Sequence, residues 1–163
     1  MYRIGLISDT HGLLRPQAVE ALRGCDHIIH AGDIGSAEVL AELSDLAPVT
    51  AIRGNVDTGP WAEAVPAATL ATLGGIQVYV IHDLATLDID PTAEGVHVVV
   101  SGHSHRPVVQ PRDGVIYVNP GSAGRRRFSL PTTVAEIVVE DGRITPRILD
   151  LLGGEDGGTG DAG

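Results

Sequence analysis

Short apolar runs alternate with amphipathic stretches in the first third of the chain. Residues 3–8, 27–31 and 49–52 are rich in Ile, Val, Leu and Ala, a pattern typical of strands buried on both faces. Between them, residues 16–24 and 36–43 have helical features. The first stretch begins with Pro16 and ends at a Gly, and Ser36 is a candidate N-cap for the second. This order predicts parallel strands joined by right-handed crossovers.

The second half of the chain has a different character. Residues 68–73 and 76–81 flank a Gly-Gly pair and predict a hairpin. Asp-Gly pairs at 113–114 and 141–142 are further hairpin signals. A weak helical pattern remains between residues 83 and 94. Further strands are expected at residues 96–101, 108–110, 115–118, 134–139 and 143–149. We therefore expect an α/β fold with two stacked mixed sheets and helices outside.

The length of the chain favours one domain. It has 163 residues, of which 43% are hydrophobic, so residues 1–152 can form a single core. Residues 153–163 are mostly Gly, Asp and Glu and are expected to form a flexible tail, whose deletion should leave stability and turnover nearly unchanged. The net charge of −10 argues against a broad nucleic-acid surface. A lone Cys25 excludes a disulfide framework and a Cys-based zinc site. With no signal-peptide layout and no apolar run of membrane length, we expect a cytoplasmic protein without a membrane partner.

Polar residues that can bind a metal follow five of the apolar runs. Groups at the carboxyl ends of neighbouring strands in an α/β sheet converge on one crevice. Carboxylate, imidazole and amide ligands together suit Mn, Fe or Zn, whereas Mg and Ca prefer an all-oxygen set. The sequence therefore predicts a metal site. Its candidate ligands are Asp9, His11, Asp33, Asn55, His82, His103 and His105.

Two divalent ions at this site would give the chemistry of a phosphate-ester hydrolase. A carboxylate can span two ions, which makes Asp33 the natural bridge. With Asp9 and Asp33 as the only anionic ligands, two ions leave a charge of about +2 that can hold a phosphate group. Ions about 3.5–4 Å apart can trap a hydroxide between them and stabilise both ends of an in-line displacement.

The same residues match a known signature. D-x-H, G-D, G-N-x-D/E, H and G-H-x-H occur in this order, at Asp9–His11, Gly32–Asp33, Gly54–Asp57, His82 and Gly102–His105. The chain therefore resembles the calcineurin-like metallophosphoesterase superfamily over roughly residues 2–150. The short sequence motifs at residues 30–34, 53–55 and 119–122 are similar to those of its small YfcE-like phosphodiesterase branch.

This resemblance implies a four-layer α/β/β/α sandwich and a metal-dependent phosphodiesterase with a metal-bridging hydroxide as nucleophile. The implied cofactors are two divalent ions, Mn first, with Zn, Fe or Ni as alternatives. Asp33, Asn55 and His103 would be the catalytic residues. One metal would be held by Asp9, His11, Asp33 and His105, and the other by Asp33, Asn55, His82 and His103.

Two positions depart from the superfamily pattern. Many members have His directly after the Asn, as general acid and phosphate contact, but Val56 stands here and can do neither. This absence favours substrates with good leaving groups. His82 is often followed by Gly, but here by Asp83, which would act as an outer-shell group near the second metal or face solvent.

Other polar residues have structural explanations. His27 and His97 are expected at the surface or at strand starts, and His30 as a hydrogen-bonded core residue. Residues 119–122 either touch the metals or form a structural loop near them. The run Arg125, Arg126 and Arg127 is either a solvated charge cluster or supplies one Arg to a substrate phosphate.

Three functional alternatives stay open. The expected partner is a small phosphate-ester substrate, and the ligands alone do not separate a phosphodiesterase from a phosphomonoesterase. The retromer scaffold subunit resembles this fold with a degraded metal site, so a non-catalytic scaffold is a second alternative, although no ligand position is lost here. A metal-regulated binding module with slow chemistry is a third. The natural substrate, the native metal and a homo-oligomeric state are left open.

Overall fold

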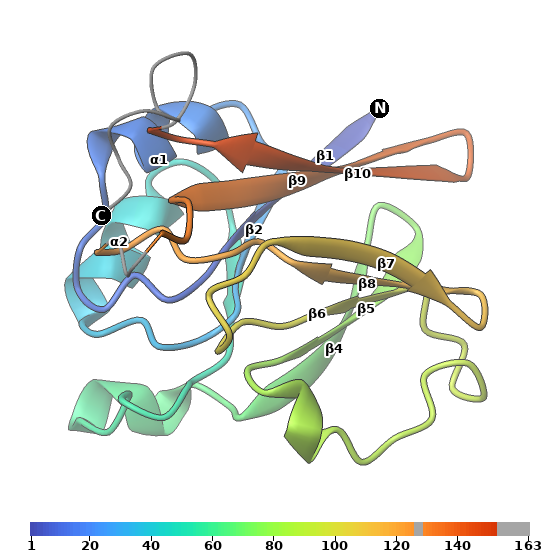
Figure 1. Ribbon diagram of the computed structural model, residues 1–163, viewed down its shortest axis with the longest axis horizontal. Coiled ribbons are helices and arrows are strands. Elements are labelled where there is room, and N and C mark those ends of the chain that lie inside the picture. The colour runs from blue at the N-terminus through green and yellow to red at the C-terminus, as the bar shows by residue number, and fades with distance from the viewer. Residues whose placement is uncertain (126–128, 153–163) are drawn as a thin grey trace.

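The computed structural model describes residues 1–125 and 129–152 as two five-stranded mixed sheets stacked face to face (Figure 1). The first sheet has the order β10 (Arg143–Asp150), β9 (Thr133–Glu140), β1 (Tyr2–Ile7), β2 (His27–His30) and β3 (Val49–Ala51). The second has the order β4 (Ala68–Leu73), β5 (Ile76–Ile81), β6 (Val98–Val100), β8 (Val115–Asn119) and β7 (Val108–Arg112). The α/β class with two mixed sheets is confirmed.

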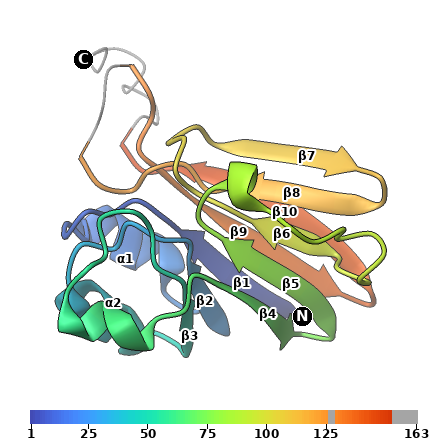
Figure 2. The same ribbon diagram turned by 90° about the horizontal axis from the view of Figure 1, so that it is seen from below.

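The first sheet is built from the predicted β–α–β–α–β order. β1 pairs in parallel with β2, and β2 with β3, while β9 runs antiparallel to β1. The crossovers contain α1 (Pro16–Leu22) and α2 (Ala37–Ser44), which lie together beside these strands (Figure 2). Ser36 is at the N-cap position of α2, but its side chain makes no capping hydrogen bond.

The second sheet contains two of the three predicted hairpins, and the third, around Asp141 and Gly142, joins β9 and β10 of the first sheet. β4 and β5 pair antiparallel around the Gly-Gly turn, and β7 and β8 pair antiparallel around Asp113 and Gly114. Both turn residues in the second hairpin have positive φ, of 52° and 80°. Asp-Gly is favoured in such a turn because its twist matches that of the flanking strands.

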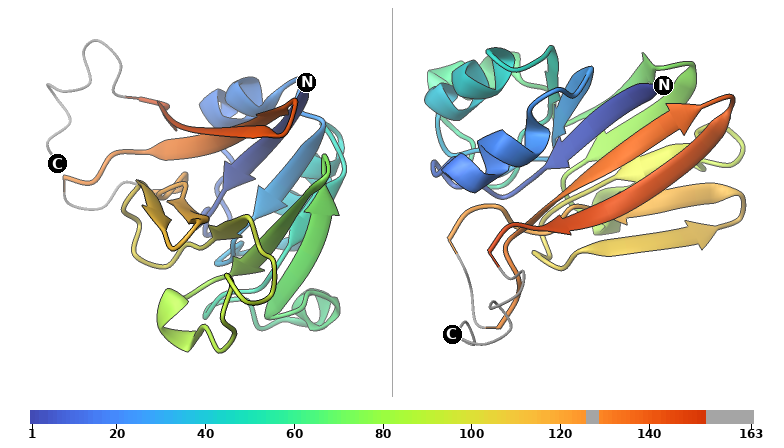
Figure 3. Two further views of the ribbon diagram at one scale, coloured as in Figure 1. Left: turned by 90° about the vertical axis from the view of Figure 1, so that its right-hand side faces the viewer. Right: turned by 90° about the horizontal axis from the view of Figure 1, so that it is seen from above.

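Apolar side chains fill the space on both sides of the first sheet. Ile4 and Leu6 of β1 face Val78 and Val98 across the gap between the sheets. Leu22 of α1 belongs to a separate cluster that packs the helices against the other face of the first sheet. Figure 3 shows both helices beside β1 and β2.

The outer face of the second sheet carries little helix. Leu87 and Ile89 pack over it, and among the described residues the helical structure of this segment is the 3-10 turn η2 (Leu84–Thr86). The helix indicated by the weak pattern at residues 83–94 is not formed. Pro91 disfavours helical backbone at the residue before it, which interrupts the segment. A second 3-10 turn, η1 (Pro60–Ala64), follows β3. Among the described helices, none combines the length and apolar character needed to cross a membrane.

Candidate metal centre

The loops that carry the candidate ligands have unusual backbone geometry. Left-handed backbone is uncommon for residues other than Gly and clusters at functional sites. Apart from two hairpin-turn aspartates, every described non-Gly residue with positive φ is a candidate ligand. The φ values are 55° for Asp9, 47° for His11, 55° for Asp33, 71° for His103 and 64° for His105.

Backbone hydrogen bonds tie these loops to one another. The N–H of Asp9 donates to the carbonyl of Gly32 at 2.9 Å, and that of His11 donates to the carbonyl of Asp33 at 2.9 Å. The N–H of Gly102 donates to the carbonyl of His82, also at 2.9 Å. Backbone hydrogen bonds thus join the loop after β1 to the loop after β2, and the loop after β6 to the loop after β5.

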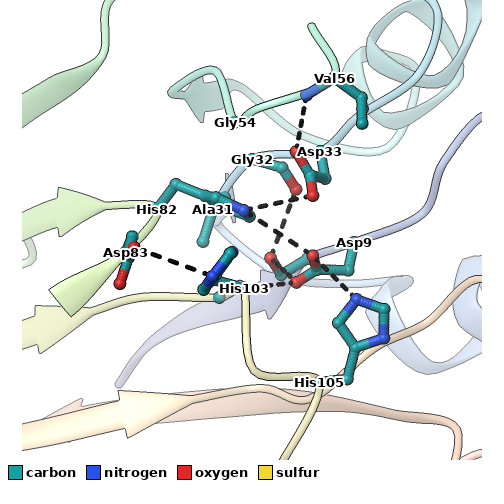
Figure 4. A network of polar contacts seen from close by, with 12 residues as sticks. Asp9, Ala31, Gly32, Asp33, Gly54, Val56, His82, Asp83, His103 and His105 are labelled. Atoms are coloured by element: carbon teal, nitrogen blue, oxygen red, sulfur yellow. Dashed lines mark hydrogen bonds and ion pairs between the residues drawn. The ribbon is translucent and has the colours of Figure 1, made fainter. Parts of the chain in front are cut away.

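The two carboxylate oxygens of Asp9 have different partners: one accepts hydrogen bonds from the protein, and the other faces the candidate ligands. Oδ2 accepts hydrogen bonds from the Ser8 hydroxyl at 2.7 Å and from the N–H of His103 at 3.1 Å. Oδ1 faces three imidazoles instead, lying 3.3 Å from Nε2 of His105 and 4.0 Å from that of His82 (Figure 4), and 3.9 Å from that of His11. The side chain is fully buried.

The two carboxylate oxygens of Asp33 differ in the same way. Its Oδ1 accepts the N–H of Val56 at 3.2 Å. Its Oδ2 lies 3.3 Å from Nε2 of His82 and 3.7 Å from Nε2 of His11. Each aspartate therefore directs one carboxylate oxygen toward both His11 and His82.

His82 is oriented from behind by the first sheet. Its Nδ1 lies 2.7 Å from the carbonyl of Ala31, which can only accept, so Nδ1 carries the hydrogen and donates it. Nε2 keeps its lone pair and points at the carboxylates. A backbone carbonyl behind a histidine is the arrangement that orients metal-ligating imidazoles.

Two buried atoms of this cluster lack a hydrogen-bond partner. They are Oδ1 of Asp9 and Nε2 of His82. Buried polar groups are nearly always satisfied, so such atoms call for an explanation. Ligand atoms of Asp9, His11 and His105 lie within 4.8 Å of one another, as do those of Asp9, Asp33 and His82. Carboxylate oxygens and imidazole nitrogens at these separations fit divalent cations of the Mn, Fe and Zn type.

The arrangement differs in part from the ligand sets that the resemblance implies. Asp9 rather than Asp33 is common to the two groups of close ligand atoms. Asn55 is exposed and lines a depression of about 450 Å³ next to His82. The His103 ring lies beside the His82 ring at 5.3 Å between centroids. The structure thus brings five of the seven candidates together and places Asn55 and His103 at the edge of the cluster.

Burial and mutual contacts shift the pKa values of the central residues. Burial raises the pKa of Asp9, against the opposing effects of the Ser8 hydroxyl and the nearby histidines. Burial also raises the pKa of Asp33, but the adjacent His82 imidazole and the hydrogen bond from the Val56 N–H outweigh it and bring the pKa to about 2. Burial lowers the pKa of His82, yet Asp33 and the Ala31 carbonyl raise it more. Asp33 is therefore a carboxylate at neutral pH, the form that binds metals.

Asp57 supports the site without belonging to it, a role that the sequence did not reveal. It is 3% exposed, and its two oxygens accept the N–H groups of Ile34 at 3.0 Å, Gly35 at 2.9 Å and Gly54 at 2.9 Å. Ile34 and Gly35 directly follow Asp33, and Gly54 directly precedes Asn55. An Asp three residues after Gly54 is the one local signal, because Asp side chains commonly cap nearby turns.

His30 is the hydrogen-bonded core residue that its position in an apolar strand predicts. The N–H of Gly32 donates to its Nδ1 at 3.2 Å, so Nε2 carries the hydrogen and donates to the Thr10 hydroxyl at 2.9 Å. That hydroxyl in turn donates to the carbonyl of Ile34 at 2.8 Å. Complete burial lowers the pKa of His30 to about 3, so the ring stays neutral.

The loop at residues 119–122 braces the site. Asn119 donates to the carbonyl of Gly102 at 2.9 Å and to the Ser104 hydroxyl at 3.1 Å. The Ser122 hydroxyl donates to the carbonyl of Asp9 at 3.1 Å. This loop thus holds the backbone of two ligand-bearing loops.

Two further polar candidates, His27 and His97, stand where strands begin. His27 begins β2 and contacts the Thr50 hydroxyl at 2.7 Å, and His97 is exposed directly before β6, as expected for both. Arg125 is exposed. Arg126 and Arg127 fall outside the described residues, as does the expected tail at 153–163.

Comparison with known proteins identifies the family. Residues 2–142 match the calcineurin-like phosphoesterase superfamily domain. The chain belongs to this superfamily. A probable metallophosphoesterase of Methanothermobacter thermautotrophicus is 35% identical over 143 residues, which cover 80% of this chain and 83% of that protein. A phosphodiesterase of Methanocaldococcus jannaschii is 26% identical over 80% of this chain and 89% of its own length.

Solved structures share the fold of this phosphoesterase domain. An archaeal phosphodiesterase superposes with a TM-score of 0.74 at 24% identity, covering 90% of this chain and 99% of its own. Vps29 from Entamoeba histolytica, solved in complex with zinc, superposes with a TM-score of 0.70 at 18% identity, covering 91% and 99%. At these identities the likeness concerns the fold alone.

Proposed function

We propose that this phosphoesterase is a dinuclear metal-dependent phosphodiesterase. One observation carries the proposal. The buried Oδ1 of Asp9 and Nε2 of His82 lack hydrogen-bond partners, although they face further carboxylate and imidazole atoms at 3.3–4.0 Å. Such an arrangement is costly for a protein without a cation and suits one that binds divalent ions.

The ligand assignment follows from the directions of the donor atoms. Asp9, His11 and His105 would hold one ion, and His82 with Asp33 the other, each through the oxygen or nitrogen that faces the cluster. Asn55 and His103 stand at the edge nearest His82 and would complete the second set. Mn is the first choice for both ions, with Zn, Fe or Ni as alternatives.

Two bound divalent ions would supply a water nucleophile at neutral pH and a positive charge for the phosphate. The chain's own residues prepare the site for this chemistry. Ser8 and the N–H of His103 hold Oδ2 of Asp9, so that Oδ1 keeps a fixed direction. The N–H of Val56 does the same for Asp33. These supports hold the ligands in place before substrate arrives, which is the way in which a preorganised site lowers a barrier.

The depression beside His82 offers room for one ester group. Its volume of about 450 Å³ is within the usual range for small-molecule sites. Tyr79 and Ile81 line it together with Arg53, Asp83 and Asp88, so it combines apolar surface with charges of both signs. A substrate whose phosphate lies at the cluster would place an ester substituent here.

Val56 supports a preference for activated esters. Its side chain is 49% exposed and has no group that can donate a proton. A general acid typically contributes about 10²–10⁴-fold, mostly where the leaving alkoxide is very basic. Diesters with acidic leaving groups need this help least. A relative from Methanocaldococcus jannaschii is named a phosphodiesterase, which supports diesters as the substrate class.

The proposal is tested by reloading metal-stripped protein with Mn²⁺ or Zn²⁺ and assaying bis-p-nitrophenyl phosphate beside p-nitrophenyl phosphate. Metal-dependent hydrolysis that favours the diester is expected. Faster hydrolysis of the monoester would instead make the protein a phosphomonoesterase. Tight metal binding without turnover of either ester would overturn catalysis and leave a metal-binding scaffold.

A further inference from the structure

Asp83 stands where the superfamily often has Gly, and the structure gives it two contacts. It follows His82 at the end of β5 and precedes η2. Its Oδ1 accepts the N–H of Ala85 at 3.0 Å, and its carbonyl accepts the Thr86 hydroxyl at 2.7 Å. The turn therefore fixes the direction of the Asp83 carboxylate.

The other oxygen of this carboxylate faces His103. Oδ2 of Asp83 lies 3.8 Å from Nε2 of His103 (Figure 4). The N–H of His103 donates to Asp9, and its ring stands edge-on to that of His82, with an interplanar angle of 78°. The His103 side chain is thus located between the Asp83 carboxylate and the cluster of candidate ligands.

We infer that Asp83 is a positioning residue for His103. Its negative charge, 3.8 Å from Nε2, favours the tautomer with the hydrogen on that nitrogen and leaves the lone pair of Nδ1 for a metal. A carboxylate behind a ligating histidine also makes the imidazole more basic, and its loss typically weakens metal binding by about 10–100-fold. The inference rests on the proposed metal site and adds a residue to it.

The competing explanation is purely structural, because Asp83 also caps η2. The two roles respond differently to one substitution. Asn caps a helical turn about as well as Asp. Asp83→Asn therefore keeps the cap and the size of the side chain but removes the negative charge that faces His103.

The test is a calorimetric titration of metal-stripped protein with Zn²⁺, using wild type, Asp83→Asn and Asp88→Asn. Asp88 is exposed and lines the same depression, so its substitution removes an equal charge nearby. We expect Asp83→Asn to weaken one of two zinc-binding steps by about 10–100-fold. The other step, and both steps in Asp88→Asn, should change by less than about 3-fold.

A second readout follows the ring itself. In long-range ¹H–¹⁵N spectra of zinc-loaded wild type, His103 should show a protonated Nε2 and a metal-bound Nδ1. In Asp83→Asn, the populations of these forms should change.

The outcomes separate this inference from the proposed function. Absence of zinc binding by wild type would overturn the metal site itself. Two zinc-binding steps in wild type with unchanged affinities in Asp83→Asn would overturn the role of Asp83 alone. An equal loss in Asp88→Asn would also overturn it, because the effect would then come from net charge.

Discussion

Replacing Asp57 tests whether a buried carboxylate holds the ligand-bearing loops in place. Three backbone N–H groups donate to it at 2.9–3.0 Å, and it is 3% exposed. A hydrogen bond to a charged group contributes about 1.5–3 kcal/mol, and buried donors left without a partner add to the loss. Because the three bonds share one side chain, we expect Asp57→Ala to lower the free energy of unfolding by about 3–6 kcal/mol.

Asp57→Asn gives a graded comparison. One oxygen of Asp57 accepts from Ile34 and Gly54, and the other accepts from Gly35. An amide can keep its oxygen toward the first pair, but its NH₂ group would face the third donor. We therefore expect roughly half of the loss seen for Ala.

The assay is urea unfolding of metal-stripped protein, followed by circular dichroism. Removing the metal separates fold stability from ligand binding, which also stabilises the folded state. The control is Asp45→Ala, an exposed residue at the end of α2, which should change stability by less than about 0.5 kcal/mol. A loss below about 1 kcal/mol for Asp57→Ala would refute the reasoning.

Three further changes test the site. Asp33→Ala should keep the circular dichroism of wild type but lower diester hydrolysis by orders of magnitude, because it removes a carboxylate that faces two imidazoles; near-wild-type turnover would contradict this. Gly102→Ala should weaken zinc binding in calorimetry, because its added Cβ would overlap the Ser8 hydroxyl and lie 2.7 Å from Oδ2 of Asp9; an unchanged affinity would show that the loop can shift freely. Wild-type rates over a series of aryl and alkyl diesters should depend steeply on the leaving-group pKa, and Val56→His should flatten that slope; a shallow slope in wild type would mean that another group donates the proton.

Much of the fold could be predicted because its strands are short apolar runs with clear ends. The strand beginning at Tyr2, the helix beginning at Pro16 and the hairpin around Gly74 and Gly75 all lie within about two residues of their expected bounds. The crevice was predictable for the same reason, because parallel strands bring their carboxyl ends to one edge of a sheet.

The supporting contacts could not be predicted, because they join residues distant in sequence through backbone atoms. Asp57 binds the turn after Asp33, and Asn119 binds the loop that contains Gly102. The signature includes Asp57, and the sequence at 119–122 includes Asn119, but neither shows which distant backbone groups the side chain binds. The left-handed backbone of the candidate ligands also depends on how the loops interlock, and local propensity favours other conformations for Asp and His.

The positions of Asn55 and His103 at the edge of the cluster could not be predicted from the sequence either. A motif states which residue types occur together, but the direction of each side chain is set by its loop. His103 is 49% exposed at its side chain and faces Asp83, whereas His82, which follows the preceding strand β5, is buried.

Anomalous scattering from crystals of protein reloaded with Mn²⁺ or Zn²⁺ tests the central claim most directly. We expect two peaks about 3.5–4 Å apart, one next to Asp9, His11 and His105 and the other next to Asp33 and His82. A single peak would reduce the site to one ion. No peak within this cluster, with the protein folded and metal in excess, would show that these residues do not form a metal centre.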